Sequence, residues 1–178
     1  MRIRKLTGEK CFLSPMDTED ADLYAQWLND LSVVRNTSMS SKVITKENEK
    51  DILRQLSQEH NYGIIDMETD ELIGSCGLMD IDSINRTCET GIMIGNSRYW
   101  DRGYGTESLY LLIDYAFKYL TINNILLRVF SFNERAVRCY KKLGFREIGK
   151  RRNAVILEMK YHDIIFMDLL PEDFYREQ

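Results

Sequence analysis

A short segment containing two glycines, between a strand-like and a helix-like stretch, most constrains the fold of this chain. Residues 88–95 read as a strand, and apolar residues recur at helical spacing from Leu109 to Leu120. Gly103 and Gly105 lie between the two. Glycine lets the backbone approach a ligand closely, and a helix start offers N–H donors and partial positive charge. The segment predicts a strand–turn–helix unit that can cradle a phosphate group, and it fits equally a turn that binds nothing.

The rest of the chain interleaves strand and helix patterns. Strands are expected at residues 11–15, 62–66, 72–79, 125–129 and 161–169, and helices after Asp17, over 45–59 and over 133–143. Asp17 is placed to cap a helix start, and Gly144 to end the last helix in a left-handed conformation. With a hairpin in the middle, this order predicts an α/β or α+β fold with a mixed sheet. The polar tail from residue 171 to 178 is expected to fray.

Length and composition predict one soluble globular domain over residues 1–178. The chain is 44% apolar and 29% charged, and its only prolines, Pro15 and Pro171, lie near the ends. No Gly/Ser-rich or Pro-rich linker divides it. The 24 basic and 28 acidic residues give a net charge of −4. This balance supplies no general attraction to nucleic acid or to an anionic membrane, so neither partner is expected.

Targeting and metal-binding signals are weak. The apolar run Leu109–Ile113 is far shorter than the roughly 20 residues of a membrane span. The N-terminus has basic residues but no apolar stretch after them, so no signal peptide is expected. The four cysteines form no CxxC pair and the two histidines lie far apart, which predicts neither a metal site nor a disulfide framework. We therefore expect a cytoplasmic protein.

Two nucleotide-binding patterns fail on this sequence. The dinucleotide fingerprint requires glycine where Ser108 stands, and the G-K-[ST] triplet of a P-loop is absent. A second informative segment starts at Asn133, a helix cap, and reaches Tyr140 about two helical turns later. Taken alone, a helical tyrosine is usually a packing residue with a hydrated hydroxyl.

Three segments in order resemble the GNAT superfamily of acyl-CoA-dependent N-acetyltransferases. They read ETGIMIG from Glu89, YWDRGYGTE from Tyr99 and NERAVRCYKKLGF from Asn133. The similarity covers most of the chain and is greatest with the branch of ribosomal-protein N-terminal and spermidine acetyltransferases. It implies a mixed, mostly antiparallel central sheet flanked by helices. Trp100 departs from the polar residue often found at this position of the phosphate loop, and we do not expect its side chain to bind phosphate.

The resemblance implies that acetyl-CoA donates an acetyl group to a primary amine, which attacks the thioester directly. The acceptor is a polyamine, a protein N-terminus or another small amine, and no metal is expected. Glu89 or a water chain serves as base and Tyr140 as acid, although Glu89 could equally be a salt-bridged strand residue. The implied cofactor-binding residues are Ile92, Met93, Ile94, Arg98, Arg102, Gly103, Tyr104, Gly105, Thr106, Asn133 and Lys142.

Several alternatives stay open. The same fold could be a non-catalytic acyl-CoA-binding regulatory module, although Glu89 and Tyr140 are both present. Acidic residues could attract a cationic acceptor, but they fit helix first turns and hydrated faces better. They are Asp17, Glu19, Asp20, Asp22, Glu47, Glu49 and Asp51. A homodimer through a shared sheet edge is a further expectation from the resemblance.

Overall fold

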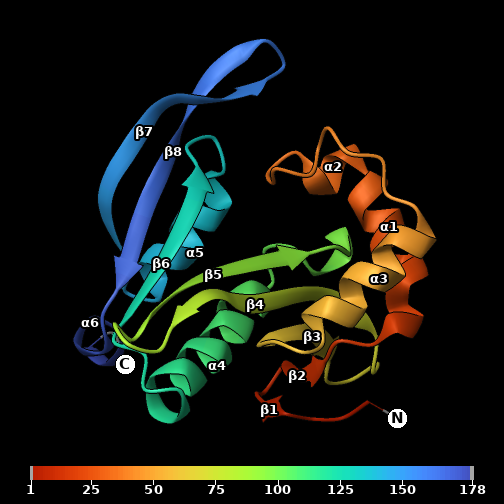
Figure 1. Ribbon diagram of the computed structural model, residues 1–178, viewed down its shortest axis with the longest axis horizontal. Helices are drawn as coiled ribbons and strands as arrows, with labels where there is room; N and C mark the ends of the chain where they lie inside the picture. The colour runs from red at the N-terminus through yellow and green to blue at the C-terminus, as the bar shows by residue number, and fades with distance from the viewer. Residues whose placement is uncertain (1, 177–178) are drawn as a thin grey trace. The chain divides into compact units, whose positions relative to one another are not determined.

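The computed structural model describes residues 2–176, in two compact units. The first comprises Met1–Leu78 and Ile92–Leu112, and the second Met79–Gly91 and Ile113–Gln178. Strands β4 (Leu72–Asp82) and β5 (Thr87–Ile94) and helix α4 (Tyr104–Tyr119) have residues in both units (Figure 1). The expectation of one domain over residues 1–178 stays a prediction. Within residues 2–176, no helix combines the length and the apolar character that crossing a membrane requires.

The first unit contains strands in the order β1-β2-β3-β4. Their bounds are Leu6–Thr7 for β1, Cys11–Pro15 for β2 and Asn61–Asp66 for β3, and neighbouring strands are antiparallel. Helices α1 (Ala21–Asn29) and α3 (Lys46–Leu56) lie side by side (Figure 1), and α2 (Leu31–Val34) follows α1. Their apolar faces meet the sheet in a core of Phe12, Ala21, Tyr24, Trp27, Val33, Leu53, Ile65 and Leu72.

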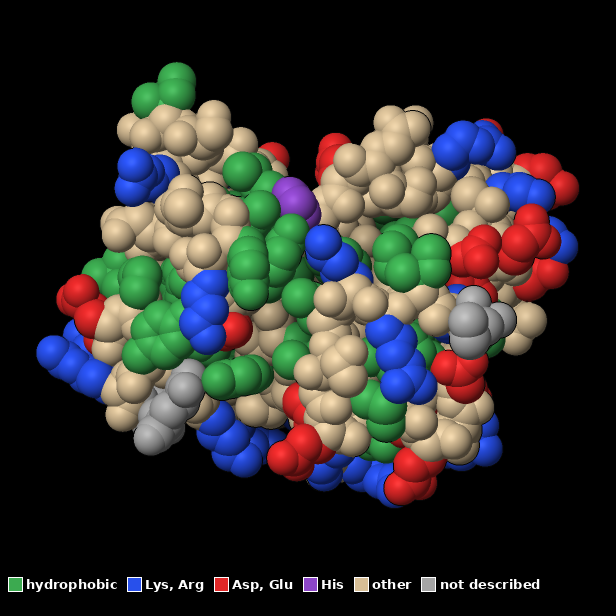
Figure 2. Space-filling model, turned by 90° about the horizontal axis from the view of Figure 1, so that it is seen from below, with side chains coloured by type: hydrophobic (Ala, Val, Ile, Leu, Met, Phe, Trp, Pro, Cys, Tyr) green, Lys and Arg blue, Asp and Glu red, His purple; other side chains and the backbone are tan. Residues whose placement is uncertain are grey.

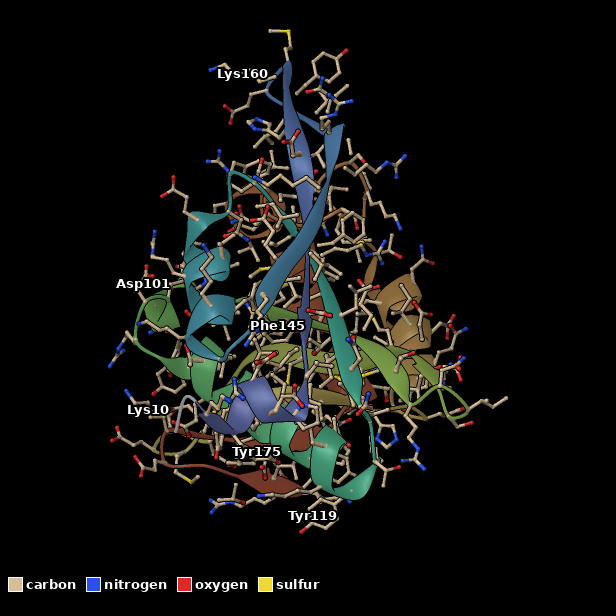
Figure 3. All side chains as sticks on the ribbon, turned by 90° about the vertical axis from the view of Figure 1, so that its left-hand side faces the viewer. Lys10, Asp101, Tyr119, Phe145, Lys160 and Tyr175 are labelled. Atoms are coloured by element: carbon tan, nitrogen blue, oxygen red, sulfur yellow. The ribbon has the colours of Figure 1, made fainter. Side chains whose placement is uncertain are left out.

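The second unit contains strands in the order β5-β6-β8-β7. Strand β6 (Asn124–Phe130) is parallel to β5 and antiparallel to β8 (Lys160–Leu169), which pairs antiparallel with β7 (Arg146–Leu157). Because alternate β6 residues Ile125, Leu127 and Val129 are buried, the period-2 pattern correctly predicted this strand. Helix α5 (Glu134–Lys142) follows β6, and the β7–β8 hairpin carries Lys160 near its free end (Figure 3).

These observations confirm the predicted fold class, a mixed and mostly antiparallel sheet flanked by helices. The predicted helix signals are also confirmed. The side chain of Asp17 accepts a hydrogen bond from the Glu19 amide, and that of Asn133 accepts one from the Ala136 amide. Gly144 has a φ of +95°, the left-handed conformation expected just after a helix.

Two parts of the second unit differ from the sequence prediction. Strand β7 was not predicted because its residues are mostly exposed and lack apolar alternation, so pairing with β8 decides its conformation. The fraying predicted for the tail is wrong for Pro171–Arg176, which forms helix α6. Phe174 is buried there against Phe117, with ring centroids 5.7 Å apart. Residues 177–178 lie outside the described part.

Strand β4 passes close to the end of β5 at Gly74, and this closeness yields a stability prediction. A Cβ atom at Gly74 would lie 2.2 Å from the carbonyl oxygen of Met93, which is a backbone atom and cannot rotate away. We expect Gly74→Ala to lower the free energy of unfolding by about 1–3 kcal/mol in urea titrations. The control is Gly149→Ala, whose Cβ would meet nothing within 4 Å. Equal stability of the two variants would contradict this packing.

Candidate functional site

The glycine segment forms a left-handed loop at the start of a helix in the first unit. Asp101 and Gly103 have φ values of +56° and +89°, and α4 begins at Tyr104. The amide of Glu107 donates to the carbonyl of Gly103 at 3.0 Å, which closes the first helical turn. Backbone amides around left-handed residues and at a helix start together form a concave anion-binding site. We call residues 101–106 the phosphate loop.

Two arginines place positive charge beside the phosphate loop. Arg98 and Arg102 are both exposed. The Arg98 guanidinium lies 3.3 Å from Glu71 Oε1, and the Arg102 guanidinium lies 6.0 Å from the centroid of the Tyr99 ring. Exposed guanidinium groups can pair with phosphate oxygens at little desolvation cost.

Three carboxylates that the sequence analysis missed hold the phosphate loop. The hydroxyl of Tyr104 donates to Asp66 Oδ1 at 2.5 Å, and that of Tyr99 donates to Glu71 Oε2 at 2.9 Å. Glu107 Oε1 accepts from the Lys10 amide at 2.8 Å. In addition, Lys10 Nζ donates to the carbonyl of Arg102 at 3.0 Å. Asp66 and Glu71 stand in no motif, and Glu107 ends the YWDRGYGTE segment without any sign of this contact, because each acts through a partner that is distant in sequence.

The end of β5 lies next to the phosphate loop within the first unit. A Cβ at Gly105 would lie 3.8 Å from Ile92 Cδ1, an ordinary contact, so this glycine packs over Ile92. Met93 and Ile94 are half-buried. The indole N–H of Trp100 donates to the carbonyl of Ile94 at 2.8 Å, and the ring packs against the core. The indole N–H of Trp100 is therefore bonded to the backbone, and the expectation that this side chain does not bind phosphate stays a prediction.

The second unit contains the predicted acid and the helix cap that precedes it. Tyr140 on α5 is 7% exposed, and its ring packs edge-on against Phe145 with centroids 5.9 Å apart. Burial raises the pKa of Tyr140 above its ordinary value, so the phenol keeps its proton to a higher pH than a solvated tyrosine does. Asn133 Oδ1 accepts from the Ala136 amide at 3.2 Å, which leaves Nδ2 as the donor of this side chain.

Glu89 also belongs to the second unit and is ion-paired. Arg128 Nε donates to Glu89 Oε1 at 2.6 Å, and the Glu89 side chain is 13% exposed. Glu89 is therefore a salt-bridged strand residue, as one of the two interpretations of the sequence expected. These contacts do not test whether Glu89 also acts as a base. Lys142 is exposed at the end of α5.

The predicted site residues thus fall into two groups. The first unit brings together Ile92, Met93, Ile94, Arg98, Arg102, Gly103, Tyr104, Gly105 and Thr106, and the second contains Glu89, Asn133, Tyr140 and Lys142.

The acidic residues near α1 and α3 are largely neutralised by neighbouring cations. Arg2 pairs with Asp20, Lys46 with Asp22, and Arg54 with Asp51. Figure 2 shows acidic and basic side chains intermixed over these helices. Glu49 differs: it is 3% exposed, its Oε2 has no hydrogen-bond partner, and burial raises its pKa. The helix-turn interpretation agrees with the positions of these residues, since Glu19, Asp20, Asp22, Glu47 and Glu49 all lie in the first turn of a helix.

Comparisons with known proteins agree with this geometry. The family model described as "Acetyltransferase (GNAT) domain" matches residues 10–146. An uncharacterized N-acetyltransferase, p20, from Bacillus licheniformis is 30% identical over 95% of this chain and 97% of its own length. The spermidine N(1)-acetyltransferase of Escherichia coli K12 is 25% identical over 93% of this chain and 88% of its own length.

A solved structure has the same fold. The spermidine N-acetyltransferase of Vibrio cholerae, in complex with CoA and spermine, aligns with a TM-score of 0.80 at 21% identity. The alignment covers 94% of this chain and 99% of that protein. From the matched family model, the p20 relative and the order of the three segments, we conclude that this chain belongs to the GNAT family of acyl-CoA-dependent N-acetyltransferases.

Proposed function

We propose that this enzyme transfers the acetyl group of acetyl-CoA to a primary amine of a polyamine, a protein N-terminus or another small molecule. The left-handed phosphate loop at the start of α4 is the observation that carries the proposal. A relative whose name specifies spermidine supports a polyamine as the first acceptor to test. Cytoplasmic location and a homodimer through a sheet edge stay predictions of the same proposal.

The residues present suit the chemical groups of CoA. Backbone amides of residues 102–106, with the Arg98 and Arg102 guanidiniums, match a pyrophosphate in charge and in donor character. Asn133 Nδ2 supplies a donor for the pantetheine arm, and Lys142 supplies charge for an outer phosphate. Backbone groups of Ile92, Met93 and Ile94 complete the proposed cofactor contacts and offer donors for the charge that develops on the thioester oxygen.

The proposed chemistry moves two protons. An alkylammonium group has an ordinary pKa near 10.4, so it must lose a proton before its nitrogen can attack the thioester carbon. Glu89, or water ordered by its carboxylate, accepts that proton. When the carbon–sulfur bond breaks, Tyr140 donates its phenolic proton to the departing thiolate. The phenol of Tyr140 is protonated at neutral pH, as any tyrosine is, and its raised pKa extends this range to higher pH.

Mass spectrometry on an acceptor panel tests the proposal. Purified protein and acetyl-CoA are incubated with spermidine, spermine, amino sugars, aminoglycosides and peptides with free N-termini. We expect an acetylated product in one amine class and release of free CoA thiol in equal amount. CoA binding in calorimetry without any product would instead support the regulatory-module alternative, and absence of CoA binding would contradict both.

Removal of the Tyr140 hydroxyl tests the acid. We expect Tyr140→Phe to lower kcat by about 100-fold or more, because general acid catalysis typically contributes that much. The Kd for CoA should stay near the wild-type value, since the ring is kept. In the wild type, kcat should show no fall up to about pH 10, because the raised pKa delays loss of the proton. An unchanged kcat in the variant would rule out this role.

Gly103 tests the phosphate loop itself. Alanine at a φ of +89° is strained by about 1–2 kcal/mol, so the free loop of the variant relaxes to another conformation. Restoring the binding conformation then raises the Kd for CoA by up to about 5- to 30-fold. Calorimetric titration of Gly103→Ala with CoA measures this change. Gly149→Ala is the matched control, because it lies outside the proposed site and has open space for a Cβ. Wild-type affinity in Gly103→Ala would show that CoA binding does not need the left-handed conformation of this residue.

A further inference from the structure

The turn between β3 and β4 makes two separate contacts with the segment that contains the phosphate loop. Asp66 is the last residue of β3, and Glu71 directly precedes β4. Asp66 binds Tyr104, which follows Gly103 within the loop. Glu71 binds Tyr99, and it also accepts from Asn96 Nδ2 at 3.2 Å. One short turn is thus bonded both to the phosphate loop itself and to the chain just before it.

The Asp66 side chain is fixed in position by burial and by hydrogen bonds. The residue is 2% exposed, and both carboxylate oxygens are engaged. Oδ1 accepts from Tyr104, while Oδ2 accepts from the Thr69 amide at 3.0 Å and the Thr69 hydroxyl at 2.7 Å. Burial alone would raise the pKa of Asp66, but the hydrogen bonds from Tyr104 and Thr69 outweigh it and lower the pKa. The carboxylate is therefore ionised, and hydrogen bonds to ionised acceptors are the strong ones.

The two tyrosines are also packed on each other. The rings of Tyr99 and Tyr104 meet edge to face, with centroids 5.0 Å apart. Tyr104 is 9% exposed, and its hydroxyl points to Asp66 inside the first unit. This side chain is consequently turned to the interior, whereas the backbone of residues 101–106 supplies the donors of the site. The hydroxyl acts on a ligand only through the backbone that it fixes.

We propose that Asp66 and Tyr104 are positioning residues, whose hydrogen bond holds the phosphate loop in its anion-binding conformation before the cofactor arrives. The effect on CoA affinity rests on the proposed function, in which the phosphate loop binds CoA. If the bond is absent, the loop spends less time in the competent conformation, and the apparent Kd rises in inverse proportion to the populated fraction. We expect the chemical step in the bound state to be unaffected, because both side chains are buried and bonded to each other.

Tyr104→Phe tests the proposal, because it removes one oxygen atom, keeps the ring and leaves Asp66 its bonds from Thr69. We expect the Kd for CoA and the KM for acetyl-CoA to rise about tenfold, with kcat within about twofold of wild type. Amide hydrogen exchange of residues 101–106 should become faster in the free protein, while exchange in α1 stays the same. The control is Tyr119→Phe, which removes a hydroxyl from a 73% exposed side chain.

Tyr99→Phe is an independent second variant that removes the bond to Glu71, and we expect a smaller change of Kd in the same direction. Unchanged Kd and loop exchange in Tyr104→Phe would overturn the inference. A matching fall in kcat with faster exchange throughout the first unit would also overturn it, since that result indicates a general folding role. If wild-type protein fails to bind CoA, the proposed function fails, but loop exchange in Tyr104→Phe still decides whether the Asp66–Tyr104 bond holds the loop.

Discussion

A buried, ionised carboxylate, Asp66, fixes the start of α4 to the end of β3, and the candidate site depends on this attachment. The loop before α4 has two left-handed residues, Asp101 and Gly103. Side chains from other parts of the first unit hold it, through Tyr104, Tyr99 and the Arg102 carbonyl. A loop that is already shaped loses little conformational entropy when an anion binds.

The two units supply different chemical groups to the proposed reaction. The first unit offers backbone amides and exposed guanidiniums, which we propose bind the phosphates of CoA by charge and by hydrogen bonding. The second unit offers Tyr140, a buried phenol, and Glu89, whose carboxylate is held by Arg128. A proton donor and a proton acceptor are what acyl transfer to an amine requires.

Local patterns predicted much of the fold. The alternation of Ile125, Leu127 and Val129 identified β6, and Asn133 with Gly144 marked the two ends of α5. Strand β7 escaped prediction because its conformation is imposed by β8 rather than by its own residues. Helix α6 escaped because one buried aromatic, Phe174, was not distinguishable within a polar tail.

Only part of the candidate site carries a signal in the sequence. Gly103, Gly105 and Asn133 stand in motifs whose spacing is visible in the sequence, and the similarity to a known family joined them. Asp66 and Glu71 carry no motif, because a supporting carboxylate is defined by what it touches. The contact between Glu107 and the Lys10 amide joins residues 97 positions apart. Only the folded chain brings such pairs together.

A crystal structure of the protein with CoA would show whether the phosphate loop binds the pyrophosphate in the conformation it already has. We expect pyrophosphate oxygens within hydrogen-bonding distance of backbone amides in residues 102–106. We also expect Tyr104 to remain bonded to Asp66 and the left-handed conformations of Asp101 and Gly103 to be unchanged. A pyrophosphate bound elsewhere would rule out this binding site, and a loop that refolds around it would rule out a loop shaped in advance.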